Sequence, residues 1–175
     1  RRLHERPELS FHEFETTEYL ENALREMGVD ELSRPCKTGL IAVIHGTKPG
    51  KAATLGVRAD IDALPIQEDN DLPYRSKTPG VMHACGHDAH IAIGLTCAKL
   101  LSRAAAELCG TVKVIFQPAE EGVRGAYAMV NAGVVDDVDY LFGGHIGFKA
   151  TADNCLVTLT DGFLATTKLD AFFTG

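Results

Sequence analysis

Residues Val81–His90 hold a cysteine, three histidines and an aspartate, and this cluster constrains the chain more than any other stretch. Thiolate sulfur and imidazole nitrogen are the donors that hold Zn²⁺ and neighbouring transition metals. Gly86 separates Cys85 from His87, and its lack of a side chain lets the backbone bend so that both donors face one ion. A single Cys or His is usually a packed core residue, but apolar helices seldom begin with this density of donors. The cluster therefore predicts a metal site at the start of a helix.

The composition excludes several classes of protein. With 175 residues, of which 45% are hydrophobic, the chain can bury a core. No apolar run approaches the roughly 20 residues of a membrane span, and the N-terminus lacks the apolar segment of a signal peptide. The net charge is −7 without a Lys/Arg run, which disfavours nucleic acid as a partner. Five scattered cysteines do not form a disulfide pattern, so we expect a reducing, cytoplasmic location.

Strand and helix patterns alternate along the chain. Ser10–Glu13 has the pattern of a capping box, and apolar residues at helical spacing follow it as far as Gly28. Short apolar runs predict strands at 39–46, 52–57, 111–116 and 139–142. A helix is expected over 87–103, buried because apolar residues cover most of its surface, and a short one over 126–132. This order predicts an α/β fold.

Acids and a histidine follow three of the predicted strands. These residues are Asp60 and Asp62, then Glu120 and Glu121, and finally the glycine-flanked His145. Ligands of open α/β sheets bind at the carboxyl ends of strands, so we expect these side chains to converge with Cys85 and His87. Each feature also suits an ordinary surface turn, and the residues alone leave that alternative open.

The adjacent carboxylates of Glu120 and Glu121 indicate a particular chemistry. One of them can bind a metal ion while its neighbour takes a proton from water whose pKa the ion lowers. Two like charges would otherwise repel each other beside a dry cavity. Glu-Glu pairs are common in solvated loops, but here Gln-Pro precedes the pair and Gly follows it. The pair therefore favours hydrolysis by general-base catalysis.

Four motifs together resemble one enzyme family. VRADIDALPIQE, GVMHACGHDAH, VIFQPAEEG and GGHIG look, in order and spacing, like the metal-dependent amidohydrolases and peptidases that include aminoacylases, carboxypeptidase G and auxin-conjugate hydrolases. Within that family, AMVNAGVVDDVDY and FLATTKLDAFFTG look most like the aminobenzoyl-glutamate hydrolase A subunit. The chain departs from that subunit by a short connection after the first helix, which leaves hippurate and other N-acyl amino acids open as substrates.

The resemblance implies a role for each site residue. Cys85 would be shared by two divalent ions, either Zn or Mn; His87 and His145 would bind one ion, and Glu121 the other. Glu120 would be the general base that activates the attacking water. Asp62 would orient a ligand; Asp60 is a weaker match, and His90 would be a supporting residue.

The family layout implies a three-layer sandwich around a mixed sheet, interrupted by an α+β lid that mediates dimerisation. In that layout residues 1–161 belong to an incomplete catalytic domain, and 162–175 form the first strand of the lid. The chain begins without Met and ends in mid-pattern, so we expect a fragment, inactive alone, of a homodimer or of a hetero-oligomer with a related subunit.

Other hypotheses remain. A non-catalytic metal-binding or interaction domain could retain the same motifs. A cysteine hydrolase using Cys85 and His87 is disfavoured, because nucleophile and base usually come from separate elements. Arg124 could bind a substrate carboxylate through a bidentate fork. The main hypothesis, with which these alternatives compete, is hydrolysis of the amide bond of a small N-acyl or N-aroyl amino acid.

Overall fold

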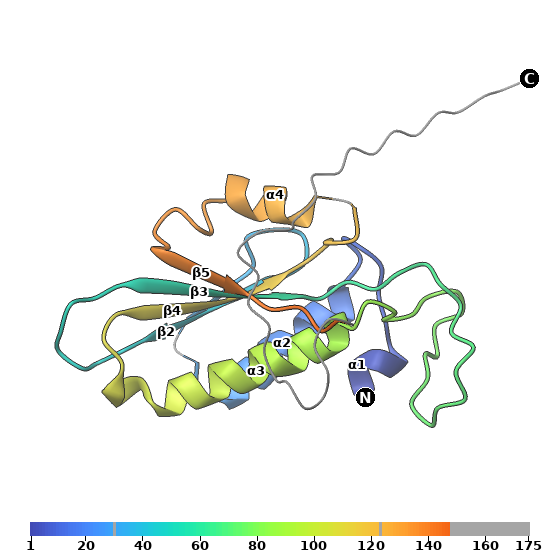
Figure 1. Cartoon of the computed structure of the whole chain (residues 1–175), viewed down its shortest axis with the longest axis horizontal. Helices are drawn as coiled ribbons and strands as arrows, with labels where there is room; N and C mark the ends of the chain where they lie inside the picture. Colours follow the sequence, from blue (N-terminus) through green and yellow to red (C-terminus); the bar gives the residue numbers. More distant parts are fainter. Residues whose placement is uncertain (30, 123, 148–175) are drawn as a thin grey trace, which may run out of the picture. The chain divides into compact units, whose positions relative to one another are not determined.

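A mixed sheet with the strand order β1-β2-β4-β3-β5 forms the centre of the described chain (Figure 1). The structure is a computed structural model and describes residues 1–29, 31–122 and 124–147. Residues Arg1–His145 form one compact unit, and Ile146–Gly175 form a second, of which only the first two residues are described.

Four of the five strands overlap the apolar runs of the sequence, and β1 was not predicted. Their bounds are Glu31–Ser33 (β1), Leu40–His45 (β2), Thr54–Asp60 (β3), Thr111–Gln117 (β4) and Tyr140–Gly143 (β5). β2 runs antiparallel to β1 and β4, whereas β3 runs parallel to both β4 and β5. The carboxyl ends of β3, β4 and β5 therefore share one edge of the sheet, and each is followed by predicted site residues.

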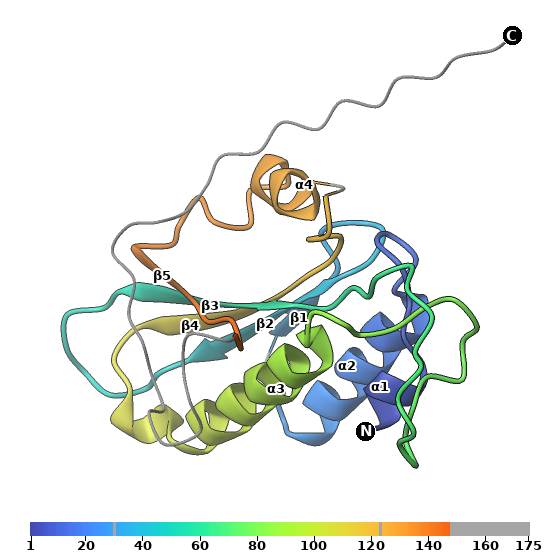
Figure 2. The same ribbon diagram turned by 45° about the vertical axis from the view of Figure 1, so that its right-hand side comes forward.

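Helices cover both faces of this sheet. The elements are α1 (Arg2–Glu5), α2 (Phe14–Glu26), α3 (His87–Arg103), the 3₁₀ turn η1 (Ala105–Glu107) and α4 (Gly125–Asn131). Figures 1 and 2 show α2 and α3 side by side against one face and α4 against the other. The predicted α/β fold with three layers is thus confirmed, and α3 has the expected bounds.

Two hydrophobic cores hold these layers together. Between the sheet and α2 and α3 lie Leu20, Leu24, Ile91 and Phe116, each of them inaccessible to solvent. Between the sheet and α4, the core includes Ile41, Ile115, Met129 and Val134. Burying one such side chain contributes about 1.5–3 kcal/mol. The edge that carries the site residues is therefore fixed by packing on both faces of the sheet.

The expected capping box at Ser10 and Glu13 is wrong. The cap of α2 comes from Glu8, whose carboxylate accepts hydrogen bonds from the amides of Glu15 and Thr16 at 3.1 and 2.8 Å. No side-chain cap comes from Glu13, the residue at the helix N-cap. Ser10 and Glu13 instead contact segments far away in the sequence, and these contacts outweigh the local pattern.

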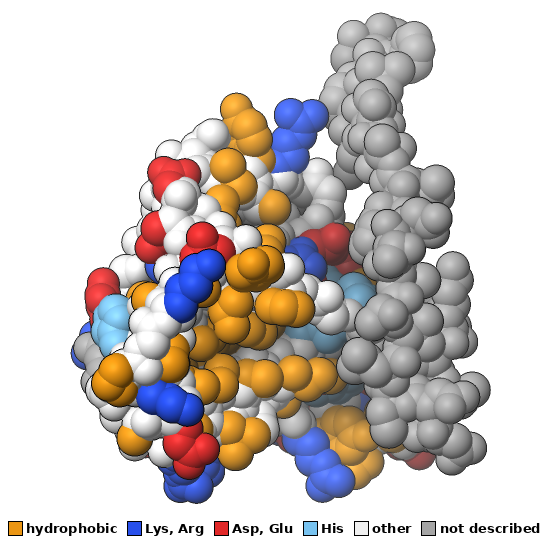
Figure 3. Space-filling model, turned by 60° about the vertical axis from the view of Figure 1, so that its left-hand side comes forward, with side chains coloured by type: hydrophobic (Ala, Val, Ile, Leu, Met, Phe, Trp, Pro, Cys, Tyr) orange, Lys and Arg blue, Asp and Glu red, His pale blue; other side chains and the backbone are white. Residues whose placement is uncertain are grey.

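The expectation that α3 is buried over most of its surface is also wrong. Its outer side leaves Ile93 and Leu100 at 53% and 60% exposure, so the helix packs through one side only. All residues of β5 are exposed as well, among them Tyr140, Leu141 and Phe142. In the space-filling view of Figure 3, hydrophobic side chains gather across the middle of one face, with charged side chains around them.

The structure bears only partly on the expected domain bounds, on a membrane span and on the state of the cysteines. The boundary after residue 161 and the lid strand at 162–175 lie outside the described residues. No described helix is both long and apolar enough to cross a membrane. Cys36, Cys85, Cys97 and Cys109 are free thiols.

Candidate metal centre

Turns at the ends of three parallel strands and the start of α3 bring the predicted donors together. Gly86 has φ +82°, a left-handed conformation that places Cys85 just before the helix and His87 on its first turn. The turn after β4 reverses at Ala119, which also has positive φ, and presents Glu120 and Glu121. His145 follows β5 by two residues.

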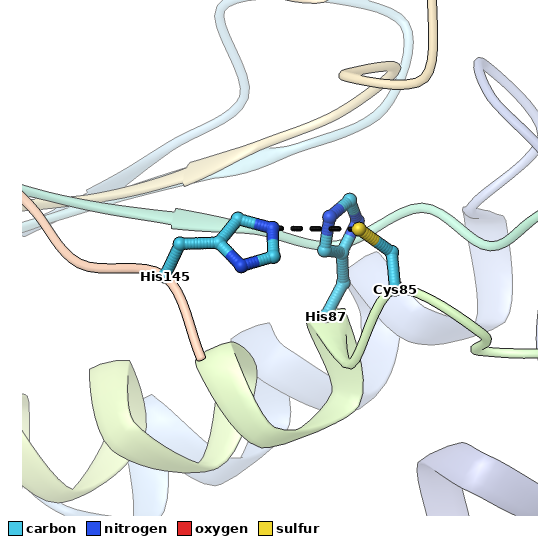
Figure 4. A group of neighbouring side chains, drawn as sticks. All are labelled: Cys85, His87 and His145. Carbon is cyan, nitrogen blue, oxygen red and sulfur yellow. Dashed lines mark hydrogen bonds between the residues drawn. The ribbon is translucent and has the colours of Figure 1, made fainter. Parts of the chain in front are cut away.

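Cys85, His87 and His145 form the first group of possible metal ligands. One donor atom from each lies within 4.8 Å of the others. Figure 4 shows the ring of His145 pointing at the sulfur of Cys85, with His87 beside them at the start of α3. Cys85 Sγ and His145 Nε2 are 3.4 Å apart. Thiolate and imidazole donors in this proximity suit a transition-metal ion.

His87 is common to two further groups. It meets Glu120 and Glu121 in one and Asp60 and His90 in the other, again within 4.8 Å. His87 Nε2 lies 3.9 Å from a carboxylate oxygen of each glutamate and 4.0 Å from Asp60 Oδ2. The donors therefore form one continuous cluster in which His87 is central.

The tautomer of His87 follows from its hydrogen bond to the backbone. Nδ1 lies 2.9 Å from the carbonyl oxygen of Asp62, which can only accept, so Nδ1 carries the proton. In the neutral ring, which is the form that binds metal, Nε2 then presents its lone pair to the cluster. This arrangement, with one ring nitrogen held by the protein and the other free to bind, is typical of metal-binding histidines.

Asp62 links three segments of the site. Its Oδ2 accepts hydrogen bonds from Ser10 Oγ at 2.7 Å and from the Glu121 amide at 3.0 Å. Burial alone would favour the neutral acid, but the hydrogen bonds from His87, Glu121 and Ser10 lower the pKa of Asp62 to about 2. Asp62 is therefore a carboxylate, and it holds both His87 and the turn after β4.

Burial and the surrounding negative charge both raise the pKa values of Cys85 and Glu120. Burial first, and then Glu121, Glu120 and Asp60, raise the pKa of the Cys85 thiol to about 12. Burial, Asp60 and Glu121 likewise raise the pKa of Glu120. A cation among these groups would reverse the effect on Cys85, because it favours the thiolate.

The donor set fits divalent ions. His87 Nε2 and Glu121 Oε1 are buried without a hydrogen-bond partner among the described residues, although such atoms normally have one. Arg58 pairs with Asp60 and donates to Gln117 Oε1 at 2.9 Å. The guanidinium of Arg58 is therefore one positive charge held at the edge of the cluster. Four carboxylates nevertheless surround His87, and their charge favours an inner cation.

The sequence analysis missed several residues that support the site. The local capping pattern concealed Ser10 and Glu13, whose partners are Asp62 and Ala119. Nothing in the local pattern of Arg58 indicated its contact with Asp60. Arg124, considered for substrate binding, is exposed at the N-cap of α4.

Comparison with known proteins places these observations in a family. The sequence profile described as peptidase family M20/M25/M40 matches residues 56–160. Indole-3-acetyl-aspartic acid hydrolase of Enterobacter agglomerans is 53% identical over 145 residues, covering 79% of this chain and 33% of that protein. The A subunit of p-aminobenzoyl-glutamate hydrolase from Escherichia coli is 50% identical, with the same coverage.

A solved structure is similar as well. The YXEP protein of Bacillus subtilis, described as a dinuclear metal binding peptidase from the M20 family, has a TM-score of 0.78 and 50% identity. The match covers 82% of this chain and 40% of that one. The chain thus spans well under half the length of these relatives.

Proposed function

This chain belongs to peptidase family M20/M25/M40, and from that premise we propose that the whole protein hydrolyses the amide bond of N-acyl or N-aroyl amino acids. The observation that supports this most is the cluster around His87, where a cysteine, histidines and adjacent glutamates from three segments meet. The names of two similar proteins add that family members act on indole-3-acetyl-aspartic acid and p-aminobenzoyl-glutamate.

The proposal includes two divalent ions, Zn or Mn. Cys85, His87, Glu121 and His145 would hold them, with Cys85 shared, and the description of the Bacillus subtilis relative as dinuclear supports the number. Bound ions would lower the pKa of water and polarise the scissile carbonyl. Cysteine and histidine favour Zn, whereas carboxylates also accommodate Mn.

Glu120 is the proposed general base. Its side chain is 38% exposed, so solvent and small molecules can reach it, and its Oε2 lies 3.9 Å from His87 Nε2. A carboxylate beside a metal-bound water can accept its proton, and Glu120 is the glutamate of the pair that is not assigned to a metal ion. Glu120 would take a proton from the attacking water and deliver it to the nitrogen of the departing amine, while Asp62 keeps His87 oriented.

The competing cysteine-hydrolase mechanism has less support. Cys85 and His145 are close enough to pair, but burial and the surrounding carboxylates raise the pKa of the Cys85 thiol. An activated nucleophilic cysteine needs a lowered pKa. A chelator distinguishes the two mechanisms, because a thiol enzyme would keep its activity in EDTA.

The assembly and location of the protein are part of the proposal. The relative from Escherichia coli is named as one subunit of its enzyme, which supports a hetero-oligomer with a related subunit; a homodimer is the alternative. Free thiols at four described cysteines are consistent with a cytoplasmic location.

The test uses the full-length protein. It would be stripped of metal, reloaded with Zn or Mn, and assayed against p-aminobenzoyl-glutamate, hippurate, indole-3-acetyl-aspartate and N-acetylcysteine. We expect amide hydrolysis of at least one substrate that disappears with the metal and returns on reloading. Metal binding without hydrolysis would instead favour the non-catalytic, metal-binding alternative.

A further inference from the structure

Glu13 is a buried carboxylate outside the donor cluster. Its side chain is inaccessible to solvent, and burial raises its pKa. Its Oε1 accepts a hydrogen bond from the Ala119 amide at 2.9 Å, and its Oε2 accepts one from Thr38 Oγ1 at 2.6 Å. Glu13 therefore joins the start of α2 to the turn after β4, 106 residues further along the chain.

The turn that Glu13 contacts is under conformational constraint. Ala119 has φ +52°, a left-handed conformation that costs free energy for a residue with a Cβ. Ala119 is also fully buried, so its amide would lack a partner without Glu13. The Ala119 carbonyl accepts a hydrogen bond from the Gly125 amide at 2.9 Å, which closes the turn on its other side.

Glu120 lies between two amides that are both held by carboxylates from other segments. The amide of Ala119 donates to Glu13, and the amide of Glu121 donates to Asp62. Asp62 is held in turn by Ser10, three residues before Glu13. The N-terminal segment thus fixes the backbone on both sides of Glu120.

We propose that Glu13 is a positioning residue for Glu120: it holds the left-handed Ala119 so that the Glu120 carboxylate faces His87. This inference rests on the proposed function, in which Glu120 is the general base. A small displacement of a catalytic group is enough to slow a reaction by about 100-fold, so a backbone tether can matter as much as a direct contact.

The test compares Glu13→Ala and Glu13→Gln in the full-length protein loaded with metal. Glu13→Ala removes the acceptor for Ala119, and we expect kcat to fall by roughly 100-fold while KM changes less than about threefold. Gln keeps the volume and an oxygen for the Ala119 amide, so Glu13→Gln should hold kcat within about fivefold of the wild type. Metal content should stay close to the wild-type level in both, because Glu121, the proposed ligand in this turn, keeps its own tether through the hydrogen bond from its amide to Asp62.

Thr38→Val is the matched control. It removes the other partner of Glu13 but leaves the Ala119 hydrogen bond, so it should lower the melting temperature without lowering kcat. A loss of kcat in Thr38→Val as large as in Glu13→Ala would assign Glu13 a merely structural role and overturn the inference.

Hydrogen exchange gives a readout that does not depend on activity. In the metal-free full-length protein, Glu13→Ala should speed exchange in a peptide covering 117–125, with a peptide from α3 as internal reference. Unchanged exchange, or an unchanged kcat, would overturn the inference. If Glu13→Ala does not fold, Glu13→Asp replaces it, because the shorter carboxylate cannot span Thr38 and Ala119 together.

Failure of the proposed function would look different. A Glu120→Gln variant that keeps full turnover would refute the role of Glu120 as base, whatever Glu13 does. Loss of turnover in Glu120→Gln together with wild-type kcat in Glu13→Ala would refute the inference alone.

Discussion

His87 Nδ1 donates a hydrogen bond to the carbonyl oxygen of Asp62 at 2.9 Å, and Asp62 Oδ1 lies 3.3 Å from the same nitrogen. The bond sets the tautomer of the ring and turns Nε2 toward the carboxylates at the ends of β3 and β4. A loop residue after β3 thereby orients the first residue of α3. The relationship makes Asp62 as important to the cluster as the donors themselves.

We predict that Asp62→Asn weakens metal binding by the full-length protein. The amide has no charge, and if its oxygen accepts from Ser10 and the Glu121 amide, its NH₂ group replaces the oxygen that lies 3.3 Å from His87 Nδ1 and faces that N–H donor. Loss of such support for a ligand costs about 10–100-fold in metal affinity. Competition with a chromophoric chelator measures the change. Asp71→Asn, in an exposed loop position, is the control and should bind like the wild type.

Cys85 should react slowly with alkylating agents when the metal is absent. Its pKa is raised to about 12, first by burial and then by the neighbouring carboxylates, so very little thiolate is present near neutral pH. Cys109 is exposed and should be modified first by iodoacetamide. Peptide mapping by mass spectrometry gives the order, and in urea the difference should vanish. Preferential labelling of Cys85 in the folded, metal-free protein would argue against the half-buried thiol among carboxylates described above.

His4 should make stability depend on pH. Burial lowers its pKa, but its hydrogen bonds to Glu68 at 3.1 Å and Asp88 at 2.9 Å outweigh burial and raise the pKa above the unfolded value. The stabilisation is therefore fully present below the unfolded pKa of about 6.5 and is lost as pH rises through the folded pKa. Urea unfolding of wild type and His4→Gln, between about pH 5.5 and about pH 8.5, should show an advantage of the wild type that shrinks with pH. An advantage that grows with pH would refute this role of His4.

Gly125→Ala should destabilise the turn that presents the glutamates. A Cβ at this position would lie 1.7 Å from the carbonyl oxygen of Pro118, and backbone atoms cannot yield as a flexible side chain can. We expect the free energy of unfolding to fall by about 2 kcal/mol or more. Gly144→Ala is the control, since no atom of the described residues lies within 4 Å of its added Cβ, and it should change stability by less than about 0.5 kcal/mol. Equal stability of the two variants would contradict the tight packing of the turn.

Local patterns predicted most of the regular structure. Apolar runs located β2 and β4 to within a residue at each end, and α3 has the predicted bounds because an apolar-rich stretch begins at Ala89, three residues after Gly86. β1 was missed, since its three residues form no apolar run and its existence depends on pairing with β2. The parallel order of β3, β4 and β5 explains why motifs far apart in the sequence meet at one edge.

The residues of the expected capping box have partners that a local sequence pattern cannot predict. Ser10 and Glu13 have the local spacing of a capping box, but their partners lie 52 and 106 residues away. A hydrogen bond from a buried amide to a buried carboxylate stabilises the fold more than a cap that is exposed to water. The local sequence does not show which of these two partners the side chain will take. The candidate donors were recognisable from their motifs, whereas the residues that hold them in place became visible only in the fold.

The most direct test of the account is the turnover and metal content of Glu120→Gln in the full-length protein, with Glu107→Gln, an exposed position, as control. The account predicts that the variant keeps two equivalents of metal while kcat for an N-acyl amino acid falls by roughly 10²–10⁴-fold. A variant with wild-type turnover would contradict the assignment of Glu120 as general base, and with it the proposed mechanism.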